Sequence, residues 1–303
     1  MHSDKGNILI TGASGLIGSA LSRALEAKGY RVWPLSRRDA SAPFYYDQQH
    51  RRMQLSQEIP LLAVINLAGA NISDGSWTEA RKREILESRQ HTSEDLCQAL
   101  AALPQPPGVL LSASAMGYYG DTGASIADES SPAGDDFLAG IARHWEAATR
   151  AAEEAGIRTV HMRLGLVLSR EGGILANFIL PLGLAAVGRV GSGRQYMSWI
   201  SLPDVVQIVM TLLTDEEVSG PINLVSEQAV QNHEFSRCLA ATLGRPRLPP
   251  LPAFVVRLMF GEMADGALLV SNRVQSLRLP ELGIKLQHPD LASALRAVLK
   301  HEQ

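Results

Sequence analysis

Three glycines near the start of the chain have the spacing of a phosphate-binding turn. Gly12, Gly15 and Gly18 follow the apolar run 8–10 and precede a helical pattern. Glycine lets the backbone turn sharply, approach a pyrophosphate and pack a helix against a strand, while N–H groups at the helix N-terminus face the anion. We expect the cofactor contacts of this turn to be Gly12, Ser14, Gly15, Leu16, Ile17 and Gly18. The segment predicts a dinucleotide site; the alternative is a tight strand-to-helix turn without a ligand.

The end of the next expected strand, over residues 30–35, indicates which dinucleotide binds. About 20 residues past the glycines, NAD enzymes place an acidic residue on the ribose 2′-hydroxyl. This chain has Ser36, Arg37 and Arg38 there. A hydroxyl and guanidinium groups suit a 2′-phosphate, because arginine offers a planar fork of donors to phosphate oxygens. The sequence therefore favours NADP(H); the alternative is two solvated arginines, with Asp39 serving the ribose.

Two further expected strands end in small or polar residues. The run 63–67 is followed by Ala68 and Gly69, and the run 109–112 by Ala113 and Ser114. Open α/β sheets bind their ligands at the carboxyl ends of the strands. We therefore expect cofactor contacts at Leu67, Ala68 and Gly69, and a ligand site along this edge of the sheet, which Ser114 ends.

Strand and helix patterns alternate through the first two-thirds of the chain, which predicts an α/β fold with a Rossmann-type doubly wound parallel sheet. Further expected elements are a helix over 138–155, a strand over 159–164, a helix beginning within 198–206 and a strand over 221–225. Glycines and prolines become frequent past residue 170. We expect a dinucleotide-binding domain over 1–170, with 195–228 returning to it, and a smaller C-terminal substrate lobe formed by 171–194 and 229–303.

Composition narrows the function classes. The 303 residues carry a net charge of −3 with both signs interspersed, so no basic surface for nucleic acid is expected. Cys97 and Cys238 lie far apart, and the eight histidines show no metal-ligand spacing, so no metal site is expected. No signal peptide and no apolar run of about 18 residues occur, which predicts a cytoplasmic protein without a membrane segment. The expected partner is a small-molecule substrate, and a homodimer is compatible with the sequence.

Several segments together resemble the extended branch of the short-chain dehydrogenase/reductase superfamily, which includes nucleotide-sugar epimerases and dehydratases. The matching segments are 11–18, 66–72, 112–120, 163–168, 191–195 and 198–200. More narrowly, the chain resembles the NAD(P)-binding "epimerase family", whose members are also described as SulA-like cell-division proteins. Its closing segment, 268–299, resembles that family's small C-terminal domain of unknown function. The resemblance extends over nearly the whole chain, but it implies little about the substrate.

The resemblance implies further site residues. Glu84 and Arg89 match the family pattern and are expected to approach the cofactor; the alternative is a solvated, charge-rich helix. Gln195 and Trp199 lie where extended-family enzymes receive their substrate, since arginine and glutamine hold polar ligands and tryptophan stacks on a sugar or base. The alternative for these two residues is a turn and a core tryptophan.

The chain departs from the superfamily at its catalytic pair. Superfamily enzymes use a serine or threonine, a tyrosine, and a lysine four residues after the tyrosine, whose charge favours the ionised tyrosine. With the helix aligned by Glu146, these two positions hold Leu138 and Ala142. Two interpretations stay open: a reductase or epimerase acting on a polar carbonyl or sugar-nucleotide-like compound through Ser114 and Tyr118 or Tyr119, or a catalytically silent NADP(H)-binding regulatory or cell-division-related partner.

Overall fold

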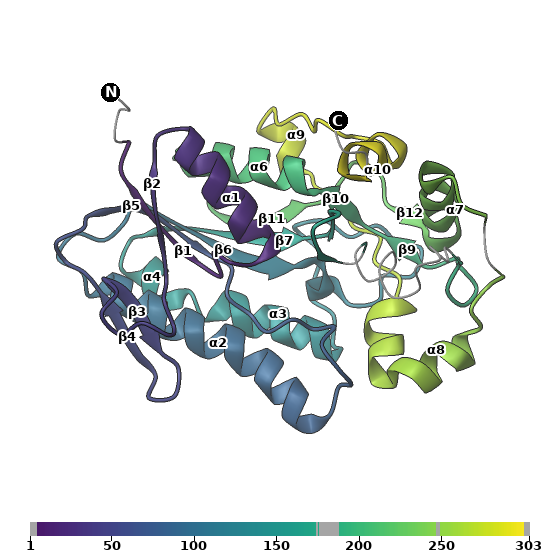
Figure 1. The fold of residues 1–303 in the computed structure, drawn as a ribbon, viewed down its shortest axis with the longest axis horizontal. Coiled ribbons are helices and arrows are strands. Elements are labelled where there is room, and N and C mark those ends of the chain that lie inside the picture. The colour runs from purple at the N-terminus through teal and green to yellow at the C-terminus, as the bar shows by residue number, and fades with distance from the viewer. Residues whose placement is uncertain (1–4, 174, 176–187, 247–248, 300–303) are drawn as a thin grey trace.

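A six-stranded parallel sheet forms the centre of the protein in a computed structural model that describes residues 5–173, 175, 188–246 and 249–299 (Figure 1). Its strand order is β2-β1-β5-β6-β7-β11. The strands are β1 (Asn7–Thr11), β2 (Arg31–Pro34), β5 (Leu61–Asn66), β6 (Val109–Ala115), β7 (Arg158–Leu164) and β11 (Gly220–Leu224). The order reverses between β1 and β5, and such a switch point opens a crevice at the carboxyl ends of the strands. The expected Rossmann-type sheet is thus confirmed.

Helices cover both faces of this sheet (Figure 1). One face carries α1 (Leu16–Ala27) and α6 (Leu202–Thr214), and the other carries α2 (Glu79–Ala101), α3 (Phe137–Ala147) and α4 (Arg150–Glu154). Alternate residues of β1 serve the two layers, because successive side chains of a strand point to opposite faces. Ile8 and Ile10 pack with α1 and α6, while Leu9 packs against α2.

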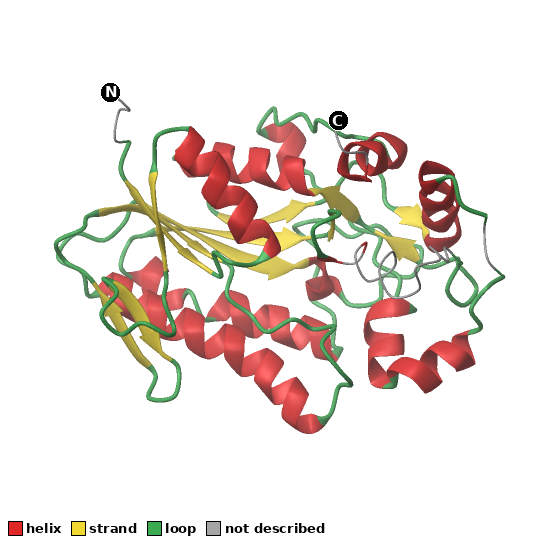
Figure 2. Ribbon diagram, in the orientation of Figure 1, coloured by secondary structure: helices red, strands yellow, loops and turns green. Residues whose placement is uncertain are grey.

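The remaining elements lie around the sheet. Figure 2 shows that the carboxyl ends of the central strands point toward the part of the molecule that carries the C-terminal helices. The strands β3 (Phe44–Asp47) and β4 (Arg52–Leu55) form a hairpin, β8 (Leu166–Leu168) pairs with β10 (Trp199–Ser201), and β9 (Tyr196–Met197) pairs with β12 (Val230–Gln231). The other helical elements are η1 (Met116–Tyr119), α7 (Asn232–Leu243), α8 (Ala253–Phe260), the π-helical turn η2 (Ala264–Leu268), α9 (Arg278–Glu281) and α10 (Leu291–Leu299).

One expected helix differs from the observed structure, and another begins where it was expected. The helix expected over 138–155 is divided into α3 and α4 around Thr149, whose N–H and hydroxyl both donate to the carbonyl oxygen of Glu146 and so tighten the turn. The helix expected to begin within 198–206 starts at Leu202, inside the expected range and directly after the short strand β10; the Ser201 hydroxyl accepts the N–H of Asp204 and caps it.

The division into a dinucleotide-binding domain and a C-terminal lobe stays a prediction. Much of its 171–194 segment lies outside the described residues, because 174 and 176–187 are not described. None of the helices in the described ranges has the length and apolar composition that a membrane span requires. The same ranges hold no group of three or more His, Cys, Asp or Glu side chains that could bind a metal ion.

Candidate dinucleotide and catalytic site

Two of the three N-terminal glycines are required by the fold itself. Gly12 has a φ of +66°, and a Cβ at this position would lie 2.9 Å from the carbonyl oxygen of Leu67. Gly18 lies where α1 packs on the turn, and a Cβ there would lie 2.8 Å from the Cα of Ala13. Neither site accepts a side chain without moving backbone. These glycines bring α1 close to the carboxyl ends of β1 and β5.

Gly15 is under no such constraint. It is the N-cap residue of α1 with a φ of −75°, and a Cβ there would have only the carbonyl oxygen of Gly12 near it, at 3.2 Å. No side chain caps the helix, and its first turn holds no acidic residue. The N–H groups of this turn and the helix dipole therefore favour an anion in front of exposed Gly15 and Ser14. This end of α1 fits a pyrophosphate.

The loop after β2 presents positive charge. The Ser36 hydroxyl accepts the N–H groups of Arg38 at 3.3 Å and Asp39 at 3.0 Å, which fixes the turn. Arg37 and Arg38 are exposed, and neither forms an ion pair with another described residue. The Asp39 carboxylate instead accepts the hydroxyl and N–H of Ser41, and these hydrogen bonds lower the pKa of Asp39. Asp39 is thus engaged within its own turn, while both guanidinium groups face solvent.

Side-chain hydrogen bonds join the carboxyl ends of the central strands. Thr11 donates to the Asn66 side chain at 2.7 Å, and its hydroxyl accepts the N–H groups of Leu67 and Ala68. The Asn66 amide donates in turn to Ser112 on β6. These bonds hold the predicted cofactor contacts Leu67 and Ala68 beside the glycine turn.

Arg89 lies against the exposed Gly69, which follows β5. A Cβ at Gly69 would come within 2.9 Å of the Arg89 guanidinium carbon, which lies 4.9 Å from the centre of the Trp145 ring. Arg89 donates to the carbonyl oxygen of Ile85, but it has no carboxylate partner among the described residues. Burial, reinforced by repulsion from Arg81, lowers its pKa to about 10. An unpaired, largely desolvated cation at this edge favours an anionic ligand.

Glu84 lies differently from Arg89. Its side chain is exposed and accepts a hydrogen bond from Arg81 at 2.7 Å. Both residues of this ion pair lie on α2, one helical turn apart. A cofactor contact by Glu84 stays a prediction.

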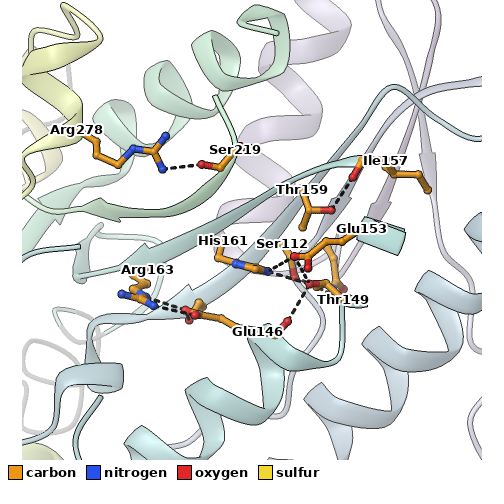
Figure 3. A network of polar contacts seen from close by, with 12 residues as sticks. Ser112, Glu146, Thr149, Glu153, Ile157, Thr159, His161, Arg163, Ser219 and Arg278 are labelled. Carbon is orange, nitrogen blue, oxygen red and sulfur yellow. Dashed lines mark hydrogen bonds and ion pairs between the residues drawn. The ribbon is translucent and has the colours of Figure 1, made fainter. Parts of the chain in front are cut away.

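Ser114, at the end of β6, belongs to a buried ion-pair network. Its hydroxyl donates to Oε1 of Glu146 at 2.7 Å. Glu146 in turn receives Nε and Nη2 of Arg163, one on each carboxylate oxygen and both at 2.8 Å (Figure 3). Ser114 is 1% exposed and Arg163 3% exposed. Burial opposes the charge of Arg163, but its hydrogen bonds to Glu146 outweigh this effect and hold its pKa above the ordinary value.

The two candidate tyrosines have different environments. The Tyr119 hydroxyl accepts Nη1 of Arg163 at 2.9 Å and donates to Asn223 at 2.8 Å, and burial raises its pKa to about 12. The ring of Tyr118 lies 3.5 Å from the guanidinium carbon of Arg163. The Tyr118 hydroxyl makes no hydrogen bond within the described part of the chain. Tyr119 is thus engaged in the network, while Tyr118 keeps an available proton.

Leu138 and Ala142, which are expected at the positions of the superfamily's tyrosine and lysine, both pack against neighbouring residues. Ala142 is 1% exposed, and Leu138 packs with the apolar residues between α2 and α3. A Cβ at Gly117 would lie 3.3 Å from the Leu138 Cβ, which shows how closely η1 approaches α3. Neither side chain carries a proton for chemistry.

Gln195 and Trp199 lie inside the protein. The Gln195 amide donates to the carbonyl oxygens of Val190 and Leu268, and the residue is 8% exposed. Trp199 is 1% exposed and packs with Leu168 and Phe235. In this arrangement the Trp199 ring offers no open face for stacking, so the structure matches the alternative of a core tryptophan.

Several residues of this site were not expected from the sequence to be functional: Trp145, Glu146, Arg163 and Asn223. A signal was available for two of them. Arg163 and Asn223 are polar residues near the carboxyl ends of strands β7 and β11, where ligands of such sheets are found. Glu146 lies at the end of α3, 32 residues from its partner Ser114, and no local pattern connects the two.

Comparisons with known proteins agree with this architecture. The model of the NAD dependent epimerase/dehydratase family matches residues 8–224, and the model of a domain of unknown function (DUF1731) matches residues 251–298. The C-terminal match therefore begins before the expected residue 268. An epimerase family protein of Mycobacterium bovis is 39% identical over 295 residues, which cover 95% of this chain and 96% of that protein.

A human relative agrees in both sequence and structure. The epimerase family protein SDR39U1 of Homo sapiens is 34% identical over 295 residues, which cover 96% of this chain and 99% of that protein. The crystal structure of this human protein with NADPH aligns with a TM-score of 0.88 and 33% identity, covering 96% of this chain and 98% of that chain. The chain described here belongs to the NAD-dependent epimerase/dehydratase family.

Proposed function

We propose that this protein binds NADPH along the carboxyl edge of its sheet. The uncapped N-terminus of α1 beside Gly15 is the observation that carries the proposal. Arg37 and Arg38 would receive the 2′-phosphate, and the unpaired Arg89 would receive a group on the other side of the glycine turn. The human relative solved with NADPH supports this choice of dinucleotide. NADPH, when bound, supplies a hydride donor.

We propose further that the protein is a reductase or epimerase acting on a polar carbonyl or hydroxyl compound. Ser114 would contact the substrate, and Tyr118 would move the proton. The support for Tyr118 is its hydroxyl, which has no partner among the described residues and lies on a ring stacked on Arg163. The Arg163 guanidinium over the ring holds the Tyr118 side chain against the network that contains Ser114.

A second candidate is a protein that binds NADPH as a regulatory or cell-division-related partner without turnover. The observation that favours it is the apolar packing at Leu138 and Ala142. These positions cannot contribute to proton transfer, so this interpretation follows if Tyr118 and Ser114 do no chemistry.

Two measurements separate these proposals. Calorimetric titration with NADPH and NADH tests the cofactor site, which is contradicted if neither dinucleotide binds. The absorbance of NADPH is then followed with a panel of aldehydes, ketones and sugar nucleotides. Oxidation of NADPH with one compound class supports the reductase. Isomerisation of a sugar nucleotide in the presence of NADP+, which accepts a hydride from the substrate and returns it, supports the epimerase and is followed by chromatography. Tight NADPH binding without either reaction favours the non-catalytic partner.

A further inference from the structure

The proton of Ser114 has a fixed direction in this structure. Its Oγ lies 2.7 Å from Oε1 of Glu146, and the same oxygen accepts Nε of Arg163 at 2.8 Å. The other oxygen of Glu146 accepts Nη2 of Arg163. A carboxylate held by a two-point contact with a permanently charged guanidinium is ionised and only accepts hydrogen bonds. The single hydroxyl proton of Ser114 must therefore point at Glu146.

We infer that Ser114 meets its ligand as a hydrogen-bond acceptor, and that Glu146, fixed by Arg163, is the positioning residue that imposes this polarity. With its proton committed to Glu146, Ser114 has only lone pairs to offer to another group. This inference rests on the proposed function for one point only, namely that Ser114 is the residue that a ligand contacts.

The inference specifies the ligand group chemically. A hydroxyl, amine or amide N–H matches Ser114, whereas a carbonyl, carboxylate or phosphate oxygen leaves two acceptors facing each other. Because Ser114 is 1% exposed, such a mismatch would occur away from water and would be strongly unfavourable. A carbonyl oxygen at this site would need another donor. Tyr118 is the nearby hydroxyl whose proton is uncommitted within the described residues.

The network behind Glu146 explains why its position is fixed. Arg163 donates Nη1 to Tyr119 and stacks on Tyr118, so all three of its nitrogens are engaged. Tyr119 then donates to Asn223 on β11, whose amide donates to the carbonyl oxygen of Gln275. The carboxylate is thus held by three central strands and a C-terminal segment. It cannot rotate away from Ser114 without breaking a buried ion pair.

Neutron diffraction from deuterated crystals of the full chain tests the polarity directly. The expected map places a deuteron on Oγ of Ser114 directed at Oε1 of Glu146, with no deuteron on either Glu146 oxygen. A deuteron on Glu146, or a Ser114 deuteron directed elsewhere, overturns the inference. This result does not depend on turnover, so failure to find a substrate would contradict the proposed enzyme and leave the polarity intact.

A thiol gives a matched test in solution. In S114C, the introduced thiol would face an ionised Glu146, which disfavours the thiolate; adding E146Q removes that charge. We expect the thiolate-to-thiol ratio of Cys at position 114 to be at least tenfold higher in the double variant than in S114C at the same pH. The ratio is measured by thiolate absorbance. The signal of the native Cys97 and Cys238 is removed by subtracting the absorbance of the corresponding proteins that keep the native serine. Y119F is the control, because it weakens the network without changing the charge of Glu146. An equal ratio with and without E146Q, in variants with native circular dichroism, overturns the inference.

Discussion

Gly18 packs directly on the turn that begins at Gly12. A Cβ at position 18 would lie 2.8 Å from the Cα of Ala13 and closer still to the carbonyl oxygen of Gly12. Gly15, midway between the two, has ordinary backbone angles and a single neighbour near its missing Cβ. The three glycines therefore serve two purposes: Gly12 and Gly18 allow the close approach of helix and strands, and Gly15 leaves space in front of the helix.

Substitutions at Gly15 and Gly18 test these two roles separately. We expect Gly15→Val to remain folded but to lose measurable NADPH binding, because the branched side chain would fill the space of the phosphates. Gly18→Ala, the contrasting variant, should lower the melting temperature because its Cβ meets backbone. Circular dichroism and calorimetric titration provide the two measurements. A folded Gly15→Val variant with unchanged NADPH affinity would show that no phosphate lies there.

Cofactor preference is expected to depend on Arg37. NADPH should bind at least tenfold more tightly than NADH, a difference of about 1.4 kcal/mol or more, because only NADPH carries the 2′-phosphate. Arg37→Ala should reduce this difference. Arg31→Ala is the matched control, since Arg31 is an exposed residue of β2 that stacks on Trp33. Equal affinities of the native protein for the two dinucleotides would contradict the assignment of the loop.

Arg89 is expected to bind the half of the dinucleotide farther from adenine. The strand order places the Arg37 loop after β2, the glycine turn after β1, and Arg89 beyond them at the end of β5. Arg89→Met should therefore weaken NADPH by about tenfold, as expected for a lost charge-assisted contact, and leave adenosine 2′,5′-bisphosphate unaffected. Arg37→Ala should weaken both ligands.

The exposed Arg83, on the same helix, supplies the control Arg83→Met. Titration of both ligands into the three variants gives the comparison. Equal weakening of both ligands by Arg89→Met would place its contact on the adenine half instead.

The central fold was predictable because its signals are local. Apolar runs such as 109–111 form strands buried on both faces, and the glycine turn specifies a helix directly after β1. The break at Thr149 was not predictable, because it depends on a threonine that also contacts His161 on β7. Trp199 could not be placed either: tryptophan serves equally in a core or a binding site, and only the packing of β10 distinguishes them.

The candidate site was predictable only where its residues follow a strand end. Ser114 ends such a strand and matches the superfamily's serine position, and the tyrosines follow it closely, but the partners of these residues come from other elements. Glu146 reaches Ser114 from α3, and Arg163 joins them from β7. Such contacts depend on how helices lie over the sheet, which a single sequence does not reveal.

Stability is expected to fall as the pH drops below about 6.5 because of His161. His161 is 9% exposed, its Nε2 lies 2.8 Å from the Thr149 hydroxyl (Figure 3), and burial lowers its pKa despite the nearby Glu146 and Glu153. The unfolded chain would take up a proton that the folded protein resists, so protonation favours unfolding. The contribution of the neutral His161 to stability is complete above the pKa that this residue has in the unfolded chain. It is lost as the pH falls toward the lower pKa of His161 in the folded protein.

Urea unfolding between pH 7.5 and 5.5 measures this loss, which one proton limits to about 1.4 kcal/mol per pH unit. His161→Gln should reduce the slope. His50→Gln is the control, because His50 is an exposed residue paired with Asp47. A slope unaffected by His161→Gln would assign the pH dependence to other groups.

Removing the hydroxyl of Tyr119 is expected to lower the stability of the protein, whereas removing that of Tyr118 is expected to lower its turnover. Tyr119→Phe leaves Arg163 and Asn223 without a shared buried partner and should cost about 1–3 kcal/mol of unfolding free energy. Tyr118→Phe removes a hydroxyl that bonds to no described residue, so stability and NADPH affinity should hardly change. If Tyr118 moves the substrate proton, its variant should lose about 10² or more in kcat, measured with whichever compound the panel identifies. If Tyr119→Phe loses turnover without losing stability, Tyr119 and not Tyr118 moves the proton. If both tyrosine variants and Ser114→Ala keep full turnover, none of the three residues takes part in the chemistry.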